Sequence, residues 1–164
     1  MRTSFFTQRI YTRSMGLKNT FGDFTCMNCQ SFVCADAVLS GVRNRNHCPY
    51  CLASRHLDLF EAGDRLSACK GAMLPIALTW KRSRKKYAHP GDGELMLVHG
   101  CRECGSLSIN RIAADDDNLL LVSLLCTSAH LDRSVLDSCS MAGIDVLGTT
   151  HASLVSRCLF GRDG

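Results

Sequence analysis

The sequence predicts a small α+β, mainly β domain in which two cysteine-knuckle lobes are bridged by a β-hairpin and followed by a C-terminal helical segment. Three features predict this fold. A Cys-x2-Cys unit occurs three times, two apolar strand-like segments flank a basic loop, and a long apolar run follows a cluster of acids. With 164 residues, 46% hydrophobic and 21% charged, the chain has the composition of a compact globular domain and not of a disordered one.

The first two knuckles have the spacing of a zinc site. Their sequence is C-x2-C-x18-C-x2-C, which in reduced proteins is typical of four thiolates around one tetrahedral zinc ion. Four-sulfur coordination leaves no position for water, so the site is expected to be structural and not catalytic. A disulfide pair and an iron site are the alternatives. The predicted ligands, which make the fold zinc-ribbon-like, are Cys26, Cys29, Cys48 and Cys51.

Metal binding requires that the cysteines are reduced. Eleven cysteines suit either a disulfide framework in a secreted protein or metal ligands in a reducing compartment. A secretory signal needs an apolar stretch of about 7–15 residues. Arg9 and Arg13 interrupt the first segment before such a stretch develops, so reduced thiols are expected. The longest apolar run, residues 119–126, is shorter than the roughly 18–20 residues that cross a bilayer, and we expect no membrane span.

The third knuckle, Cys101 and Cys104, needs two further ligands to bind a second zinc ion. If residues 72–80 and 94–100 pair as antiparallel strands, the residue before the first strand lies beside the residue after the second. This pairing brings Cys69 next to Cys101. The alternative is a knuckle without metal, with Cys69 as a small core residue.

A histidine is expected to complete the second site. His56 lies in an upstream loop that can fold over the knuckle, whereas His99 is only two residues from Cys101 and is awkward to aim at the same ion. We therefore favour His56 over His99. The sequence thus predicts one zinc ion and allows a second.

The remaining elements follow in chain order. Residues 106–112 (SLSINRI) alternate enough to predict a third strand. The acids of residues 115–118 (DDDN) indicate a helix start, because carboxylates stabilise a helix N-terminus. One or two helices are predicted from Leu119 to Cys139, and no pattern predicts an element after Ser140.

The loop of the predicted hairpin is strongly basic. Five of the six residues 81–86 are cations, and an aromatic residue flanks the run on each side. Clustered cations neutralise phosphates, and an exposed aromatic ring stacks on a base. We expect this loop to bind RNA or a ribonucleoprotein surface. A solvated loop tip and an address signal are the alternatives. The predicted nucleic-acid-binding residues are Trp80, Lys81, Arg82, Arg84, Lys85, Lys86 and Tyr87.

Residues 43–58 (RNRNHCPYCLASRHLD) resemble the signature of the RNHCP family of small zinc-finger-like domains. The remaining family blocks have counterparts in the same order at residues 24–30, 63–78, 99–105 and 110–118. The resemblance spans about residues 21–125 and implies a zinc-binding domain, without a particular activity. Family members often carry Gly near position 30 and a large residue near position 53, where this chain has Gln30 and Ala53. The loss of Gly is expected to weaken the turn of the first knuckle.

Charged residues near the knuckles are expected to be structural. Arg43, Arg45 and His47 flank the second knuckle, where cations balance the charge of a four-thiolate zinc site or, alternatively, contact phosphate. Arg111 is expected to pair with Asp116 and Asp117 between the two lobes.

Two further function classes compete with RNA binding. A protein-interaction adaptor would use the acidic second half of the chain and the apolar helix after Asn118. A metal-dependent hydrolase or nuclease would use histidines and aspartates, but nothing in their spacing selects catalysis over packing. We therefore predict no catalytic residue. The residues of such an enzyme would be His47, His56, Asp58, Asp116 and Asp117.

Charge divides the chain into unlike parts. Residues 1–90 carry 14 Lys and Arg against 5 Asp and Glu, whereas residues 91–164 carry 5 against 10. The basic half is suited to a polyanion, although the two halves can also simply attract each other.

The first 20 residues form a basic extension. They contain no acid, their composition suits a mitochondrial transit peptide, and the alternative is a disordered extension of a cytoplasmic protein. A helix there would separate Phe6, Ile10 and Leu17 from Arg2, Arg9 and Arg13. We expect a cytoplasmic protein, with the mitochondrial matrix as the alternative. The predicted parts are a basic extension (1–20), a zinc-binding domain (21–127) and a helical or irregular tail (128–164).

Overall fold

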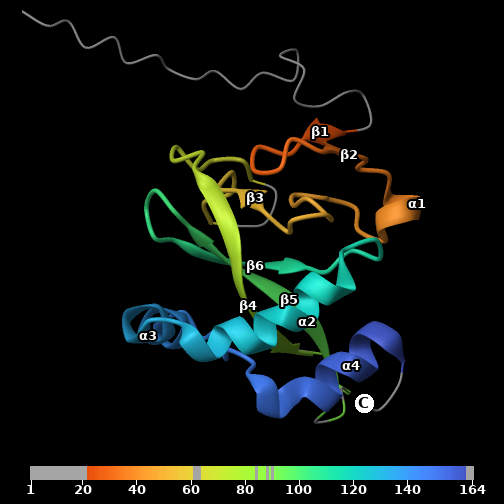
Figure 1. The fold of residues 1–164 in the computed structure, drawn as a ribbon, viewed down its shortest axis with the longest axis vertical. Coiled ribbons are helices and arrows are strands. Elements are labelled where there is room, and N and C mark those ends of the chain that lie inside the picture. Colours follow the sequence, from red (N-terminus) through yellow and green to blue (C-terminus); the bar gives the residue numbers. More distant parts are fainter. Residues whose placement is uncertain (1–21, 61–63, 84, 88, 90, 162–164) are drawn as a thin grey trace, which may run out of the picture.

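The described part of the chain forms two antiparallel sheets and a C-terminal group of helices (Figure 1). This computed structural model describes residues 22–60, 64–83, 85–87, 89 and 91–161. The predictions for residues 1–20 and for Arg84 therefore lie outside the described residues. The predicted α+β fold, with two knuckle-like lobes, a bridging hairpin and C-terminal helices, is confirmed.

The larger sheet is a four-stranded antiparallel meander. Its strands lie in the order β3 (Ser54–Arg55), β4 (Ala72–Arg82), β5 (Gly93–Cys101) and β6 (Leu107–Arg111). The predicted hairpin is β4 and β5, and the predicted third strand is β6. The hairpin register sets Met73 opposite Cys101 at one end and Arg82 opposite Gly93 at the other.

A proline interrupts the regular pairing of β4. Pro75 has no N–H to donate to a neighbouring strand, and prolines within sheets are found at edges and bulges. The register between β4 and β5 shifts between Pro75 and Ala77, so Ile76 forms a bulge. The strand continues beyond the bulge to Arg82.

Each face of the sheet is covered by helices because alternate strand residues point to opposite faces. Leu78 and Leu97 pack under α2 (Asn118–Thr127) and α4 (Ala152–Phe160), whereas Ala77 and Val98 pack against α3 (Arg133–Met141) and its flanking residues. The first core consists of Leu52, Leu78, Leu95, Leu97, Leu121, Leu124, Leu125, Leu147 and Val155. Two short 3-10 turns, Ser128–His130 and Thr149–His151, connect these helices.

The start of α2 confirms the prediction from the acidic cluster. The Asp117 carboxylate accepts hydrogen bonds from the N–H groups of Leu119 and Leu120 at 2.9 and 3.2 Å. This cap satisfies two of the helix's free N-terminal donors.

The helix α4 was not predicted. Its only buried residue is Val155, with Leu154 and Leu159 partly buried beside the core, and Gly161 ends it in a left-handed conformation with φ of 67°. The helical spacing of these residues before a terminal glycine is the signal that sequence reasoning missed.

The smaller lobe surrounds the first two knuckles. It contains the two-residue strands β1 (Phe24–Thr25) and β2 (Phe32–Val33) and the single-turn helix α1 (Ala37–Ser40). Its buried apolar cluster consists of Cys26, Val33, Cys48 and Ala53. So few apolar side chains rarely hold a lobe together without a metal or disulfides.

In the described ranges, no single helix is long and apolar enough to span a membrane. The pair Asn118–His130 and Arg133–Met141, bent by 108°, meets such a test by length and composition alone.

Candidate metal centres

All three knuckles are built on the same backbone turn. In each, the N–H of the first cysteine donates to the carbonyl five residues later, and its own carbonyl accepts from the N–H four residues later, over 2.8–3.0 Å. The residue at this fourth position has a positive φ, 62° at Gln30, 57° at Leu52 and 73° at Gly105. A left-handed backbone costs a residue with a Cβ on the order of 1 kcal/mol. Glycine is therefore the better residue at position 30, as the family pattern has it.

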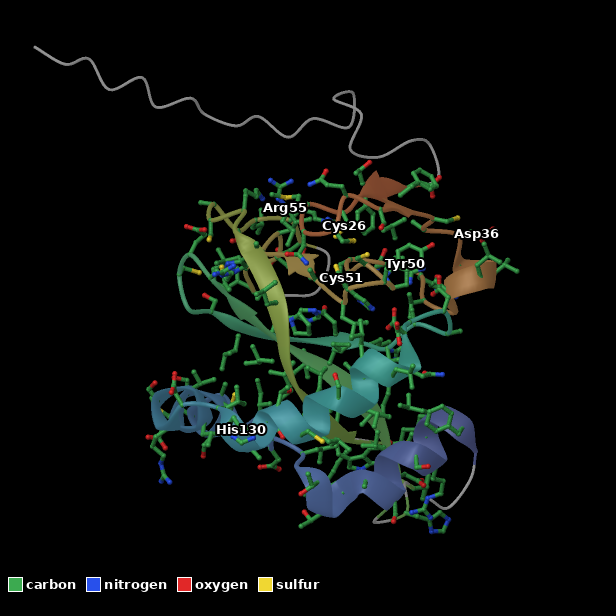
Figure 2. All side chains as sticks on the ribbon, in the orientation of Figure 1. Cys26, Asp36, Tyr50, Cys51, Arg55 and His130 are labelled. Atoms are coloured by element: carbon green, nitrogen blue, oxygen red, sulfur yellow. The ribbon has the colours of Figure 1, made fainter. Side chains whose placement is uncertain are left out.

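The first cluster brings together the four cysteines of the first two knuckles. The Sγ atoms of Cys26 and Cys51 lie 3.6 Å apart, as do those of Cys29 and Cys48. All four sulfurs lie within 4.8 Å of one another. Figure 2 shows Cys26 and Cys51 near each other beneath the β1–β2 lobe.

The second cluster brings together the other four predicted ligands. The Sγ atoms of Cys69 and Cys101 lie 3.6 Å apart, and His56 Nδ1 lies 3.2 Å from the Sγ of Cys104. The four ligand atoms lie within 4.8 Å of one another. The hairpin register explains this, because Cys101 ends β5 opposite Met73, near the start of β4.

His99, the rejected alternative ligand, has a different position. Its side chain is fully buried, with Nε2 2.7 Å from the carbonyl oxygen of Leu52 and Nδ1 accepting from Asn110 Nδ2 at 2.8 Å. Both ring nitrogens are therefore occupied by partners other than the cysteines.

The thiols of the two clusters differ in acidity. Hydrogen bonding by the hydroxyl of Ser31 lowers the pKa of Cys29 to about 6, and the hydroxyl of Ser106 does the same for Cys104. Burial raises the pKa of Cys26 and Cys48, and raises that of Cys69 to about 11. Each cluster thus combines one thiol of lowered pKa with at least one thiol whose raised pKa requires a nearby cation for ionisation.

The two serines occupy equivalent places. Ser31 Oγ is 3.3 Å from Cys29 Sγ, and Ser106 Oγ is 3.1 Å from Cys104 Sγ, so knuckles one and three share a Cys-x2-Cys-x-Ser pattern. Knuckle two has Ala53 at this position. Sequence reasoning missed these serines, although the shared pattern is visible in the sequence.

The donor sets fit a zinc ion. Sulfurs held tetrahedrally at about 2.3 Å from one zinc lie about 3.8 Å apart, close to the 3.6 Å separations within the clusters. Four sulfurs in the first cluster, and three sulfurs with an imidazole nitrogen in the second, are ligand sets of structural zinc sites. The N–H of Asn28 also points to Cys26 Sγ, at 3.4 Å, as a stabilised thiolate requires.

A close backbone approach shapes the second cluster. A Cβ added to Gly71 would lie 2.5 Å from Glu103 Cγ and 3.1 Å from Cys101 Sγ. Glycine at this position lets the segment after Cys69 pass against the third knuckle.

Comparison with models of protein families shows which family contains this sequence. A family model described as the RNHCP domain matches residues 21–122. The chain belongs to the RNHCP domain family. Searches of curated proteins and of solved structures found no match. The residues that match the RNHCP model include all eight cluster residues and end within α2.

Arg45 and His47 of the RNHCP signature belong to a buried ion-pair network. Arg45 donates to both carboxylate oxygens of Asp115, each at 2.7 Å, and its Nη2 lies 3.4 Å from Asp116. His47 Nε2 lies 2.8 Å from the other oxygen of Asp116. The side chains of Arg45 and Asp116 are 0% exposed. This network fastens the first lobe to the segment before α2.

Asn46, Cys48 and Pro49 of the signature also connect the first lobe to the rest of the domain. Asn46 Nδ2 donates to Asn110 Oδ1 at 2.6 Å, and Asn110 bonds His99 on β5. Cys48 belongs to the first cluster, and the carbonyl of Pro49 accepts from the N–H of Asp117 at 3.0 Å. In this chain the RNHCP signature therefore joins the first cluster to the sheet and to α2.

The structure corrects the expected partner of Arg111 and gives the partners of Arg45. Arg111 Nε pairs with Glu94 Oε1 at 3.1 Å, not with Asp116 or Asp117, because β6 sets residue 111 beside β5. Arg45 has the structural role that was favoured for it, because its side chain is buried and pairs with carboxylates of a distant segment.

The residues of a hydrolase do not form one site. His56 belongs to the second cluster, His47 and Asp116 are buried together with side chains 1% and 0% exposed, and Asp117 caps α2. Asp58 Oδ1 lies 3.9 Å from Arg65 Nε. These side chains are divided among separate structural roles.

The predicted RNA-binding residues that the structure describes lie at the far end of the hairpin. Lys81, Arg82, Lys85 and Lys86 are exposed, and Tyr87 is 86% exposed with Lys86 Nζ 5.7 Å from its ring centre.

Trp80 is placed differently from the other hairpin residues. It packs against the core and its indole covers Gly93, where an added Cβ would lie 2.4 Å from Nε1. A ring in this position supports the hairpin, and part of it remains exposed.

Proposed function

We propose that each cluster binds one structural zinc ion and that the resulting domain binds RNA, free or within a ribonucleoprotein, through the tip of the β4–β5 hairpin. The exposed cationic tip with its exposed tyrosine is the observation that carries the RNA part of this proposal.

Zinc would act here as a cross-link. Cys26, Cys29, Cys48 and Cys51 would hold one ion, and His56, Cys69, Cys101 and Cys104 the other, with every coordination position filled by protein. The metal supplies stability and no open position for substrate. Bound structural zinc contributes on the order of 10–16 kcal/mol in small peptides, more than the net stability of a typical domain.

The charge at the hairpin tip suits a polyanion. Residues 81–94 contain five Lys and Arg against two acids, Asp92 and Glu94. Glu94 is paired with Arg111, and the Asp92 carboxylate accepts from the N–H of His89 at 2.9 Å within the turn. Both acids are thus engaged, and Lys81, Arg82, Lys85 and Lys86, the tip cations that the structure describes, are exposed to a ligand.

The hairpin tip lies away from the second cluster. Met73 lies opposite Cys101 and Arg82 opposite Gly93, so nine residues of β4 separate the two ends. At about 3.3 Å per residue this is roughly 30 Å. The second cluster would fix the base of the hairpin, and the tip would contact phosphates.

The test is the salt dependence of RNA binding. Each phosphate contact releases counterions, so each lost contact lowers the log–log slope for single-stranded RNA by about 0.7. Changing Arg82, Lys85 and Lys86 to Ala should flatten the slope by about 2 units. Tyr87→Ala should weaken binding with little change of slope, because stacking contributes about 1–3 kcal/mol per base without ion release.

The matched control removes three exposed cations elsewhere. Arg43, Arg102 and Arg133 are exposed and lie outside the hairpin tip. Their change to Ala should leave the slope within about 0.5 units of the wild type. Equal slopes in the two triple variants, or no RNA binding at low salt by a zinc-loaded protein, would reject the RNA proposal and favour a protein-interaction adaptor.

A further inference from the structure

An exposed apolar surface lies on the side of the molecule that carries α1 and the start of α2. Its members come from α1, from the tip of the second knuckle and from α2. Single exposed apolar residues are common, but contiguous ones mark interaction sites. This surface, here called the α1–α2 face, consists of Val38, Leu39, Tyr50, Leu119 and Val122, which are 89%, 60%, 60%, 79% and 36% exposed.

Backbone hydrogen bonds hold the three parts of the α1–α2 face together. The N–H of Ala114 donates to the carbonyl of Ser40, the last residue of α1, at 2.8 Å. The N–H of Asp117 donates to Pro49, next to Tyr50, at 3.0 Å. In Figure 2 Tyr50 lies between Cys51 and Asp36, which precedes α1. The three segments that carry these apolar residues are therefore fastened side by side.

Acidic residues border this face. Asp36 and Asp117 are exposed caps of α1 and α2, and Asp115 is 40% exposed beside them. The Asp115 partner, Arg45, is fully buried, so the outer side of that carboxylate faces solvent. Arg43 is the exposed cation of the same knuckle segment. An apolar surface with an acidic border is complementary to a basic segment with apolar residues.

The described chain begins at the edge of the same face. A Cβ added to Gly22 would lie 3.7 Å from Cβ of Ala35, and the Asp23 carboxylate accepts from the N–H of Ala35 at 2.8 Å. Ala35 directly precedes Asp36 and α1. Residues 1–21 therefore join the domain beside the α1–α2 face.

We propose that residues 1–20 bind the α1–α2 face of their own chain. These residues lie outside the described part of the chain. They contain Phe6, Ile10 and Leu17 together with four cations and no acid, the chemistry that the face complements. A segment attached at the edge of its binding surface has an effective concentration of about 1 mM, so contacts with a Kd of about 0.1 mM keep it roughly nine-tenths bound.

Trypsin cleavage of the full zinc-loaded chain tests this proposal. Cleavage after Arg9 and Arg13, followed by mass spectrometry, reports the fraction of time the segment is unbound. Val38→Ser with Leu119→Ser should raise this rate about 10-fold, because losing both apolar contacts weakens binding about 100-fold and leaves the segment unbound nearly all the time. Met141→Ser is the matched control, because Met141 is 90% exposed on α3, away from the face, and it should leave the rate unchanged.

A reciprocal variant leaves the folded domain untouched. Phe6→Ser with Ile10→Ser should raise the rate to the same extent, and adding the face substitutions should raise it no further. Equal rates in the wild type and in both double variants would overturn the proposal. So would additive effects of the two double variants, or protection that increases with protein concentration and thus arises between chains.

Discussion

Replacing Arg45 by Met tests whether buried charges of the RNHCP signature hold the lobes together. The Arg45 side chain is 0% exposed and donates to both Asp115 oxygens at 2.7 Å, to the Cys34 carbonyl at 3.2 Å and to the His47 carbonyl at 3.3 Å. Methionine fills a similar volume without any donor.

The expected loss of stability is about 3 kcal/mol, the lower end of the roughly 3–5 kcal/mol for breaking a buried ion pair. The lower end applies because Asp115 is 40% exposed and can be hydrated. Asp116 also keeps His47 Nε2 and the N–H of Ala113, both at 2.8 Å.

Urea denaturation at pH 7 and fixed free zinc measures this loss. The control is Arg133→Met, because Arg133 is 88% exposed and its pair with Asp137 lies on the surface. That change should cost below about 0.5 kcal/mol. Adding Asp115→Asn to Arg45→Met should cost little more, since the carboxylate has already lost its partner. A loss under about 1 kcal/mol for Arg45→Met, or one equal to the control, would refute the reasoning.

Two further predictions concern pH and backbone strain. Burial lowers the pKa of His99 from 6.5 to about 4, so the unfolded chain binds more protons in this range and stability falls as pH drops from 6.5 toward 4. Between pH 7 and pH 5 the wild type should lose about 2 kcal/mol more than His99→Gln, and parallel urea midpoints would contradict this. Gly105→Ala should lose about 1 kcal/mol through φ alone, because its φ is 73° and an added Cβ meets nothing within 4 Å. Gly148→Ala, equally open but at φ of −115°, should lose nothing; similar thermal shifts for both would reject the strain account.

Most of the correct predictions came from the spacing of residues close together in the sequence. The knuckle pairs and the hairpin register were enough to bring Cys69 beside Cys101, and the acidic run correctly indicated the cap of α2 at Asp117. His56 was preferred over His99 on chain geometry, and the structure places His56 beside Cys104.

Long-range polar pairing could not be read from the sequence. Arg45 and Asp115 are 70 residues apart, and charge alone does not select among several acids near a basic residue. The predicted partners of Arg111 were wrong for the same reason, because only the β5–β6 register brings Glu94 beside Arg111.

Short elements also escaped prediction. The strands β1, β2 and β3 have two residues each, too few for an alternating pattern. Their positions follow from the knuckle turns, which are themselves set by the clusters.

The zinc content of the purified full-length chain tests the central claim most directly. Elemental analysis should give two zinc ions per chain, one fewer in Cys48→Ser and one fewer in Cys104→Ser, and chelation should unfold the first lobe, whose apolar cluster is small. Less than one zinc ion per chain, or a domain that stays folded without metal, would contradict the claim.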